Sequence, residues 1–444
     1  MKRKEDILNE RGRKLLEEAM NCWDTGKKMR RDRRRAKDFA FGRHWDDVVE
    51  GKERKMSERE LILSQGGYPL QNNLLGRIVR HVVGLYRSRA ESKDKDLPDL
   101  LKKSERNNEA EELYARTMEE FLLSGMAVHR KRFGIREGRA GVWTRVVSPA
   151  DFFCRRESSD PRSWDLTSVG QLHRIGFGTW CGEFVKTKED YLRALRIFPE
   201  GKGTVRLAEI WRRERRPRLL IHDPQQGVLR KEEAWSKPRF GERSLWMLDD
   251  VWRYYFITER GEIISEGDSP YAFGGHPYIV RAYPMVDGEI HSFVADLIDQ
   301  QKYANRLITL YDWSVRASAK GVLLVPEQSV EPGRLAEVAE SWSRFDGVIS
   351  YKGKAGEPEP HQVSSSMSHP GIAQLLEIQL KMLEDVSGVT GTLQGNLSAS
   401  TVSGSLYSQQ TENALTSLRD LLESFDSFKE ECRRKEMEMI RQFG

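Results

Sequence analysis

Asp296 and Asp299 lie three positions apart in a helical stretch, a spacing at which two carboxylates could share a metal ion. On a helix surface such a pair is far more typical of a solvated face or a subunit contact. The nine histidines are scattered, and no His-Glu-x-x-His motif occurs. We therefore expect no metal site and no cofactor.

Nucleotide-binding and nucleophile motifs are missing as well. Residues 198–204, Phe-Pro-Glu-Gly-Lys-Gly-Thr, have the composition of a Walker A loop but lack its upstream glycine. Residues 176–182 miss the dinucleotide-binding glycine pattern by one position. Neither Gly-x-Ser-x-Gly nor a Cys–His pairing with family context is found. These absences predict a protein that is not an enzyme.

The remaining candidate is an uncharged stretch, residues 387–404, in a chain that is 32% charged. Helical patterns flank it, at about 372–386 and 406–443. A loop this long is usually either functional or a plain flexible linker, and its own residues do not decide between the two. Its polar side chains are able to hydrogen-bond phosphates loosely: Thr390, Thr392, Gln394, Asn396, Ser398 and Ser400.

The net charge of +5 is concentrated near the N-terminus. Residues 1–60 hold 19 Lys and Arg against 14 Asp and Glu, which accounts for the whole excess. The densest basic run, residues 27–37, is able to meet phosphates or an acidic partner, or to be a solvated helix face. The four cysteines (Cys22, Cys154, Cys181, Cys432) are widely spaced, so neither a disulfide scaffold nor a zinc site is expected.

No apolar run is long enough to span a membrane, and the charged N-terminus has no secretory signal. We expect a soluble protein made in a cytoplasm. With 444 residues and a hydrophobic share of 38%, the chain is predicted to fold into two or three structural regions.

The hydrophobic periodicity predicts an α+β fold that is mainly α. Helices are expected over residues 5–40, from an N-cap at Asn72 or Asn73, and over about 107–125. Residues 126–282 change to short strands with one helix near 188–197, and Trp211, Trp246 and Trp252 are predicted to be core residues. The β-type runs are 141–147, 172–177, 206–212, 218–222 and 252–258.

A long helix over 289–320 follows the β-rich region. A small αβ insertion comes next, with strands at 321–326 and 347–352 around a helix at about 333–343. The helix at 372–386, the uncharged loop and the final helix complete the chain. An ordinary linker has no reason to follow this order of elements.

Four local phrases stand out along the chain: Phe41–Trp45 (Phe-Gly-Arg-His-Trp), the predicted helix Asn72–Gly84, the sheet entry Val147–Phe153, and His291–Asp312 with Asp299-Gln300-Gln301 and Asn305. Each is weak alone, but their sequence along roughly residues 35–430 is stronger. Taken in this order, the four phrases resemble those of portal proteins of tailed double-stranded DNA bacteriophages.

The resemblance implies a portal fold and a non-enzymatic role. In it residues 1–285 form the wing, 286–320 the first stem helix, 321–362 the clip, 363–386 the second stem helix, 387–404 the tunnel loop, and 405–444 a long C-terminal helix toward the wing and crown. Such proteins form a dodecameric ring at one capsid vertex of the virion, assembled in the host bacterial cytoplasm. The ring is the channel for genome packaging and ejection.

The implied partners are other copies of the chain, double-stranded DNA bound without sequence specificity, the terminase large subunit, major capsid and scaffold protein, and a head-completion or tail adaptor, with no membrane. Lys381 is the candidate channel-facing charge of the second stem helix, although a helical pair with Glu377 explains it equally well. In the clip, docking is expected at Arg334, Arg344, Lys352 and Lys354.

One departure from the resemblance concerns the C-terminus. Many relatives continue into a larger crown or barrel, whereas this chain stops at Gly444, so the crown is expected to be minimal or the chain truncated. Two alternatives remain: a nucleic-acid-processing enzyme or motor subunit of the packaging machinery, which would need a nucleotide loop or carboxylate–metal cluster, and a helical scaffold that binds protein only.

Overall fold

The structure is a computed structural model of the whole chain. It describes residues 4–50, 55–64, 66–93, 97–158, 160, 162–224, 227–320, 322–325, 332–343, 361–363, 370–389 and 404–444. The fold is mixed, with about 50% helix and 28% strand, which is compatible with the predicted α+β class. The chain divides into a first unit (residues 1–37, 77–296 and 388–444) and a second unit (residues 38–76 and 297–387).

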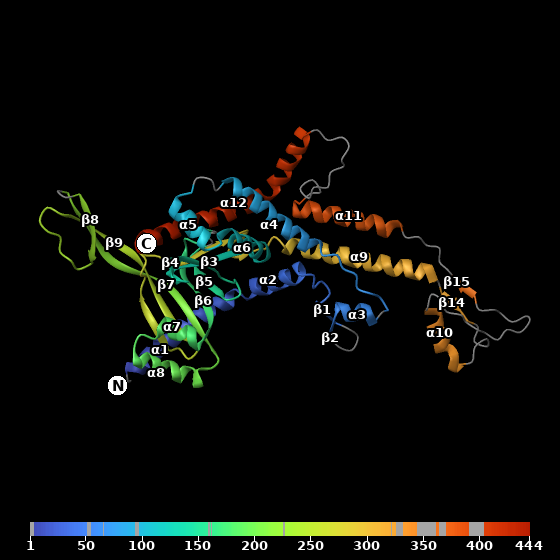
Figure 1. The fold of residues 1–444 in the computed structure, drawn as a ribbon, viewed down its shortest axis with the longest axis horizontal. Helices are drawn as coiled ribbons and strands as arrows, with labels where there is room; N and C mark the ends of the chain where they lie inside the picture. Colours follow the sequence, from blue (N-terminus) through green and yellow to red (C-terminus); the bar gives the residue numbers. More distant parts are fainter. Residues whose placement is uncertain are drawn as a thin grey trace, which may run out of the picture. The chain divides into compact units, whose positions relative to one another are not determined.

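Two antiparallel sheets pack face to face in the first unit (Figure 1). The larger sheet has the order β10-β9-β7-β6-β5, with β8 paired to β7, and the smaller has the order β11-β3-β4. Their strands are β3 (Met126–Arg136), β4 (Arg139–Val146), β5 (Phe152–Arg156), β6 (Leu166–Gly176), β7 (Thr204–Asp223), β8 (Val228–Glu233), β9 (Arg243–Thr258), β10 (Ile263–Asp268) and β11 (Tyr278–Ala282).

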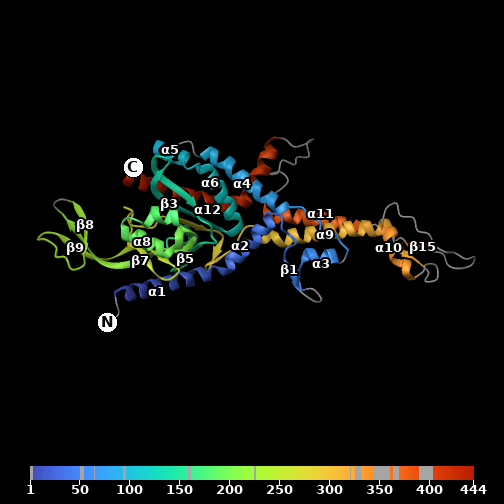
Figure 2. The same cartoon turned by 60° about the horizontal axis from the view of Figure 1, so that its bottom comes forward.

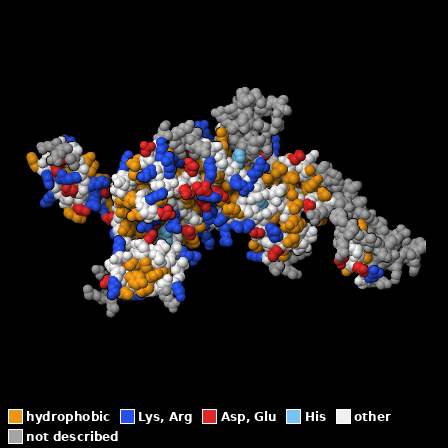
Figure 3. Space-filling view, in the orientation of Figure 1, with side chains coloured by type: hydrophobic (Ala, Val, Ile, Leu, Met, Phe, Trp, Pro, Cys, Tyr) orange, Lys and Arg blue, Asp and Glu red, His pale blue; other side chains and the backbone are white. Residues whose placement is uncertain are grey.

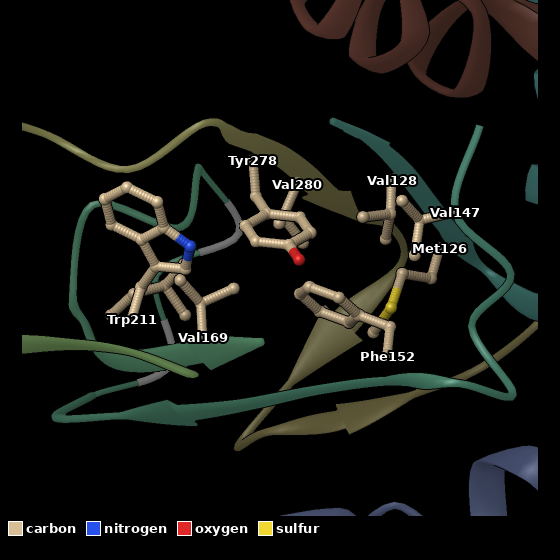
Figure 4. Packing of buried hydrophobic residues seen from close by; sticks show 9 residues of the cluster. Met126, Val128, Val147, Phe152, Val169, Trp211, Tyr278 and Val280 are labelled. Carbon is tan, nitrogen blue, oxygen red and sulfur yellow. The ribbon is translucent and has the colours of Figure 1, made fainter. Parts of the chain in front are cut away.

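Alternation along the strands gives the larger sheet two apolar faces. Trp211 and Phe152 point toward the smaller sheet and meet Tyr278 in a buried cluster (Figure 4). Ile210 and Phe153, one position away, lie on the opposite face and pack against Leu15 and Ala19 of helix α1 (Lys4–Thr25).

An ion cluster lies buried between the two sheets. Glu209 of β7 accepts hydrogen bonds from Arg130 Nε of β3 at 3.1 Å and from Trp211 Nε1 at 2.8 Å. Its other carboxylate oxygen lies 2.8 Å from His173 Nε2 of β6. Burial alone would raise the pKa of Glu209, but the Arg130 charge and the His173 contact lower it to about 2. The carboxylate therefore stays charged and joins three strands of two sheets.

Helix α12 (Gly404–Phe443) packs on the smaller sheet together with α6 (Ala110–Ser124), and α5 (Asp99–Asn107) packs against both helices. Phe425 and Phe428 are buried there, and Glu436 pairs with the buried Lys131 of β3. Lys435 Nζ donates to the backbone oxygens of His276 at 3.0 Å and Tyr278 at 2.6 Å. The last helix is thus tied to the sheet by buried polar contacts as well as apolar ones.

The rest of the first unit comprises helices and short strands around these layers. A lobe of α7 (Phe177–Phe184) and α8 (Lys188–Ile197) packs around Trp180 and Phe198. The other elements are α2 (Lys27–Ala40), α4 (Leu74–Lys93), the turn Pro199–Gly201, and the paired strands β12 (Met285–Val286) and β13 (Glu289–Ile290). Helix α2 ends in the second unit, and helix α4 begins there.

In the second unit, two helices run antiparallel side by side: α9 (Ala295–Lys320) and α11 (Pro370–Ser387) (Figures 1 and 2). Between them the chain forms β14 (Val322–Leu324), the turn Pro332–Arg334, α10 (Leu335–Ser343) and β15 (His361–Val363), and β14 pairs antiparallel with β15. The unit also holds β1 (Val48–Glu50), β2 (Lys55–Ser57) and α3 (Glu58–Ser64).

Several predicted boundaries are wrong. The helix expected over residues 5–40 is interrupted at Gly26, where the Thr25 hydroxyl donates to the Cys22 oxygen and glycine lowers helix propensity. The helix expected from residue 289 begins at Ala295, because Asp287 and Gly288 have positive φ and turn the chain into a hairpin.

Other errors concern the β region. The separate strands expected at 206–212 and 218–222 are one strand, β7, and Pro217 fits because it lies between the parts of β7 paired with β6 and with β8. Trp211 is buried as predicted, but Trp246 is exposed. Asn73 is confirmed as an N-cap, since its side-chain oxygen accepts from Gly76 N at 2.8 Å.

Candidate functional site

The stem-like helix pair of the second unit is the candidate site, and a buried polar network holds it to residues 38–76. Gln301 of α9 accepts from Leu75 N at 2.9 Å and donates to the Asn72 oxygen at 2.8 Å. Asn305, one turn further, lies 2.8 Å from His44 Nδ1. The side chains of Gln301 and Asn305 are almost completely buried.

The tautomer of His44 follows from its partners. Its Nε2 lies 2.8 Å from the backbone oxygen of Phe39, which only accepts hydrogen bonds, so Nε2 carries the proton and Nδ1 accepts from Asn305 Nδ2. Burial lowers the pKa of His44 and keeps the ring neutral. Residues from three separate sequence phrases (Phe41–Trp45, Asn72–Gly84 and His291–Asp312) therefore meet in one network.

Ion pairs extend this connection toward the middle of α9. Lys302 Nζ lies 2.6 Å from Asp47 Oδ2 and 2.9 Å from Glu58 Oε1, and Arg306 reaches the same Glu58 oxygen at 2.9 Å. Both basic side chains of α9 therefore form ion pairs with carboxylates of the second unit.

Helix α11 shows three differently composed faces. Its inner face contains the buried Gln379 and Leu383, and Gln379 donates to the backbone oxygen of Gln300 on α9 at 3.3 Å. A second face carries apolar side chains that are about half exposed. At spacings of three and four residues these form the α11 stripe, Leu375, Ile378, Met382 and Val386.

The third face of α11 is charged. Glu377, Lys381 and Asp385 follow one another at four-residue spacing and are exposed. Within the described part of the chain, no ion pair is formed between Glu377 and Lys381, so the helical pair considered from the sequence is not present. Lys381 is accessible between two acidic side chains.

The other predicted site residues divide into described and undescribed ones. Arg334 is exposed and pairs with Glu337 at 3.1 Å on α10. Arg344, Lys352 and Lys354 lie outside the described residues, as do Thr390, Thr392, Gln394, Asn396, Ser398 and Ser400. The predicted strand at 347–352 also lies outside them.

The basic run 27–37 forms part of α2, and several of its charges are used internally. Arg33 pairs with Glu120 at 2.6 Å, Lys28 pairs with Glu289 at 3.2 Å, and the Arg30 guanidinium lies 3.6 Å from the centre of the Trp23 ring. This part of the run packs within the first unit, and Arg31 and Arg34 remain exposed.

The described residues offer little for metal or thiol chemistry. The described residues contain no cluster of three His, Cys, Asp or Glu side chains placed to hold a metal, and Asp296 pairs instead with His291 Nε2 at 2.7 Å. All four cysteines are free thiols, and burial raises the pKa of Cys432 to about 12. In the described part of the chain, no helix has the length and apolarity that crossing a bilayer requires.

The α11 stripe was not predicted from the sequence. The signal was present, because apolar residues occur on more than one side of this helix, a pattern typical of a helix that is covered on several sides. The charged residues Glu377 and Lys381 are more conspicuous in the sequence, because charges stand out against an apolar helix pattern.

Comparison with models of known protein families matches residues 16–443 to the phage P22-like portal proteins. The chain belongs to this family. Portal proteins are structural, oligomeric components of the phage capsid vertex, so the resemblance noted from the sequence is confirmed. A search of curated proteins found no match.

Proposed function

We propose that this portal protein closes into a ring of about twelve copies whose central channel passes the genome during packaging and ejection. The observation that carries the proposal is the α11 stripe. Four apolar side chains on one face of a helix remain half exposed in the single chain, although the neighbouring face is already covered by α9. Covering each of them would stabilise an interface by on the order of 1 kcal/mol.

In this ring the helices α9 and α11 are the first and second stem helices, and the stripe packs against the stem of a neighbouring copy. The wing is residues 1–285, the clip 321–362 and the tunnel loop 387–404. The long C-terminal helix α12 ends at the wing side. The structure offers support within each unit: α12 docks on the β sheet of the first unit, and β14 with β15 closes the insertion between the stem helices.

The charged face of α11 suits weak contact with DNA. In a ring each side chain recurs once per copy, so Glu377, Lys381 and Asp385 become stacked rings of alternating charge. Lys381 attracts phosphates, and its acidic neighbours limit how tightly DNA is held. We propose that this face lines the channel, together with the uncharged polar residues of the tunnel loop.

The clip is proposed as the docking site for the terminase large subunit during packaging and for head-completion or tail proteins afterwards. Arg334 on the exposed turn before α10 is the described residue of this set. Scaffold and major capsid protein are the proposed partners during assembly in the host cytoplasm.

Negative-stain imaging of the purified chain tests the ring directly. We expect rings with a central hole and about twelve subunits. Uniform monomers or dimers, also in the presence of scaffold or capsid protein, would contradict the proposal. Measurement of particle mass in solution gives the subunit number independently of the image.

A further inference from the structure

A three-stranded arm extends from the larger sheet of the first unit. It consists of residues 217–223 of β7, 228–233 of β8, 243–249 of β9 and the connection 234–242. Figures 1 and 2 show β8 and the adjoining ends of β7 and β9 reaching beyond the other strands of the sheet. Hydrophobic side chains are visible on its surface in Figure 3.

The strand register assigns the exposed side chains of the arm to two faces. Residues directly opposite each other share a face, and neighbours along a strand alternate. Trp246 and Leu248 of β9 stand opposite Leu219 and Pro217 and define face A.

Face B lies on the other side of the same strands. Leu245 stands opposite Leu220, and Leu229 of β8 stands opposite His222. Four apolar side chains of the two faces are more than 60% exposed: Trp246 and Leu248 on face A, and Leu245 and Leu229 on face B. Trp235 and Phe240 in the connection are also exposed, so the arm presents apolar surface on both faces and at its tip.

The charges of the arm are largely satisfied inside it. Arg230 pairs with Glu242 at 2.6 Å, Lys231 pairs with Asp249 at 2.7 Å, and Arg218 pairs with Glu233. Either face can therefore be covered without leaving these charges unpaired, which removes the main cost of burying a charged strand surface. The recognition chemistry left on the surface is apolar and aromatic.

The exposed area is larger than isolated surface residues explain. An aromatic side chain buries roughly 150–250 Å² when it is covered, so two Trp, one Phe and three Leu together represent several hundred Å². This area is divided between face A, face B and the tip, and exposed apolar surface of this extent indicates an interaction site.

We propose that each arm packs between the arms of two neighbouring copies, with face A of one copy against face B of the next. The inference rests on the proposed ring. A cyclic head-to-tail assembly uses two different surfaces of every copy, whereas a two-fold contact would join A to A and leave B exposed. An element with apolar residues on both faces needs the first kind of contact, so the occupant is a second copy of this chain.

Cross-linking between single engineered cysteines tests this arrangement. One chain carries Leu248→Cys on face A and another carries Leu245→Cys on face B, and the two are mixed before ring assembly and treated with short and long bis-maleimides. We expect linked dimers from the mixture and none from either chain alone. A chain carrying both substitutions should give a ladder that extends to the full ring.

The controls separate the arm contact from the ring itself. The parental chain reports any reaction of the four native cysteines, and ring formation of each variant is checked by particle mass. Rings that give no A-to-B links, or links from Leu248→Cys alone, contradict the arm stacking and leave the ring proposal intact. Absence of rings from the parental chain contradicts the ring, and the arm stacking with it.

A second measurement does not depend on cross-linking geometry. A double variant with Trp246→Ser and Leu248→Ser loses apolar area from face A. The concentration at which its rings half-dissociate should therefore be at least tenfold higher than for the parental chain. Leu192→Ser on the exposed side of α8 is the matched control and should have no such effect. Face A variants that form rings of unchanged stability but fail to enter capsids would assign the arm to the capsid shell and overturn the proposal.

Discussion

Asn305 Nδ2 lies 2.8 Å from His44 Nδ1 and connects the middle of α9 to a segment 261 positions earlier in the chain. The same Asn305 accepts from Gln301 Nε2 at 3.0 Å, and Gln301 in turn binds the backbone just before α4. A neutral histidine and two amides thus fix where the stem-like helix begins to pack. None of these side chains is exposed, so their role is positioning within the second unit.

Replacing Asn305 with leucine should destabilise the second unit by about 1–3 kcal/mol for each buried partner that is left unsatisfied. His44 Nδ1 loses its donor and Gln301 loses an acceptor. Thermal unfolding followed by circular dichroism measures the effect. Gln374→Leu, on the exposed side of α11, is the control, and an equal loss in both variants would show that the network contributes no specific stability.

Glu209→Gln should be strongly destabilising at neutral pH, by about 3–5 kcal/mol, because it leaves Arg130 buried without its counter-charge. The pKa of Glu209 is lowered to about 2, against a usual value of 4.5. A lowered acid pKa gives stability that is complete above pH 4.5 and is lost as the pH falls toward 2.

The difference in the free energy of unfolding between wild type and Glu209→Gln should therefore be largest near pH 7 and become smaller below pH 4.5. Denaturant unfolding at a series of pH values measures it. Glu259→Gln, in the exposed turn after β9, should change stability little at any of these values. A gap between wild type and Glu209→Gln that does not depend on pH would be inconsistent with a charged Glu209 as the source of stability.

Lys435 should make the stability of the first unit depend on alkaline pH. Burial lowers its pKa to about 8, from a usual value of 10.5. Between these values the unfolded chain binds more protons than the folded chain, so stability should rise as the pH increases from 8 to 10.5.

Lys435→Met should remove this rise, and Lys103→Met, an exposed lysine of α5, should retain it. Denaturant unfolding at pH 7.5, 9 and 10 makes the comparison. If the free energy of unfolding changes with pH equally in the two variants, Lys435 is not the titrating group.

The element order was predictable because it rests on apolar periodicity. The patterns for α8, α11 and α12 are long or well capped, and the structure has these helices within a few residues of the predicted bounds. Strand β3 was not predicted because its inward positions include His129 and Lys131, which read as surface residues. They are buried because Glu436 and Cys432 of α12, about 300 residues away, supply partners.

The candidate site was predictable only in part, because segments far away in the chain decide which of its side chains are covered. A single sequence shows which residues carry charge, and the hypothesis that Lys381 and Glu377 face the channel stays a prediction. It does not show which of two apolar faces of a helix is already covered, and so the α11 stripe became visible only when α9 was placed beside Gln379 and Leu383. The prediction that Trp246 is a core residue was wrong because the residue lies on an arm that extends from the sheet, where its side chain stays 62% exposed.

Ile378→Asp should prevent ring formation without unfolding the chain. In the single chain this side chain is about half exposed, so an aspartate there is solvated and costs little. In the proposed interface the same carboxylate would be buried without a partner, at a cost of several kcal/mol per copy, and the ring population should fall more than tenfold. Particle mass at several protein concentrations measures it. Gln374→Asp, on the charged side of α11, should leave ring assembly unchanged.

Deleting residues 390–402 should leave rings intact and impair DNA packaging or retention. The uncharged loop is proposed to contact DNA in the channel, and helices α11 and α12 on either side have their own packing within the units that contain them. Particle mass reports the ring, and the DNA content of filled heads reports packaging. Loss of the ring would instead show that the loop is structural.

Adding charge to the same loop tests the reason for its composition. Thr392→Lys and Gln394→Lys together would place two cationic rings in the channel, and each phosphate neutralised by a lysine releases counterions and strengthens the hold on DNA. Packaging in this double variant should be slower at low salt and should recover as salt is raised, because counterion release weakens with ionic strength. Thr392→Ser with Gln394→Asn keeps the loop uncharged and should package at the wild-type rate. A lysine variant that packages normally at every salt concentration would place the loop away from the DNA.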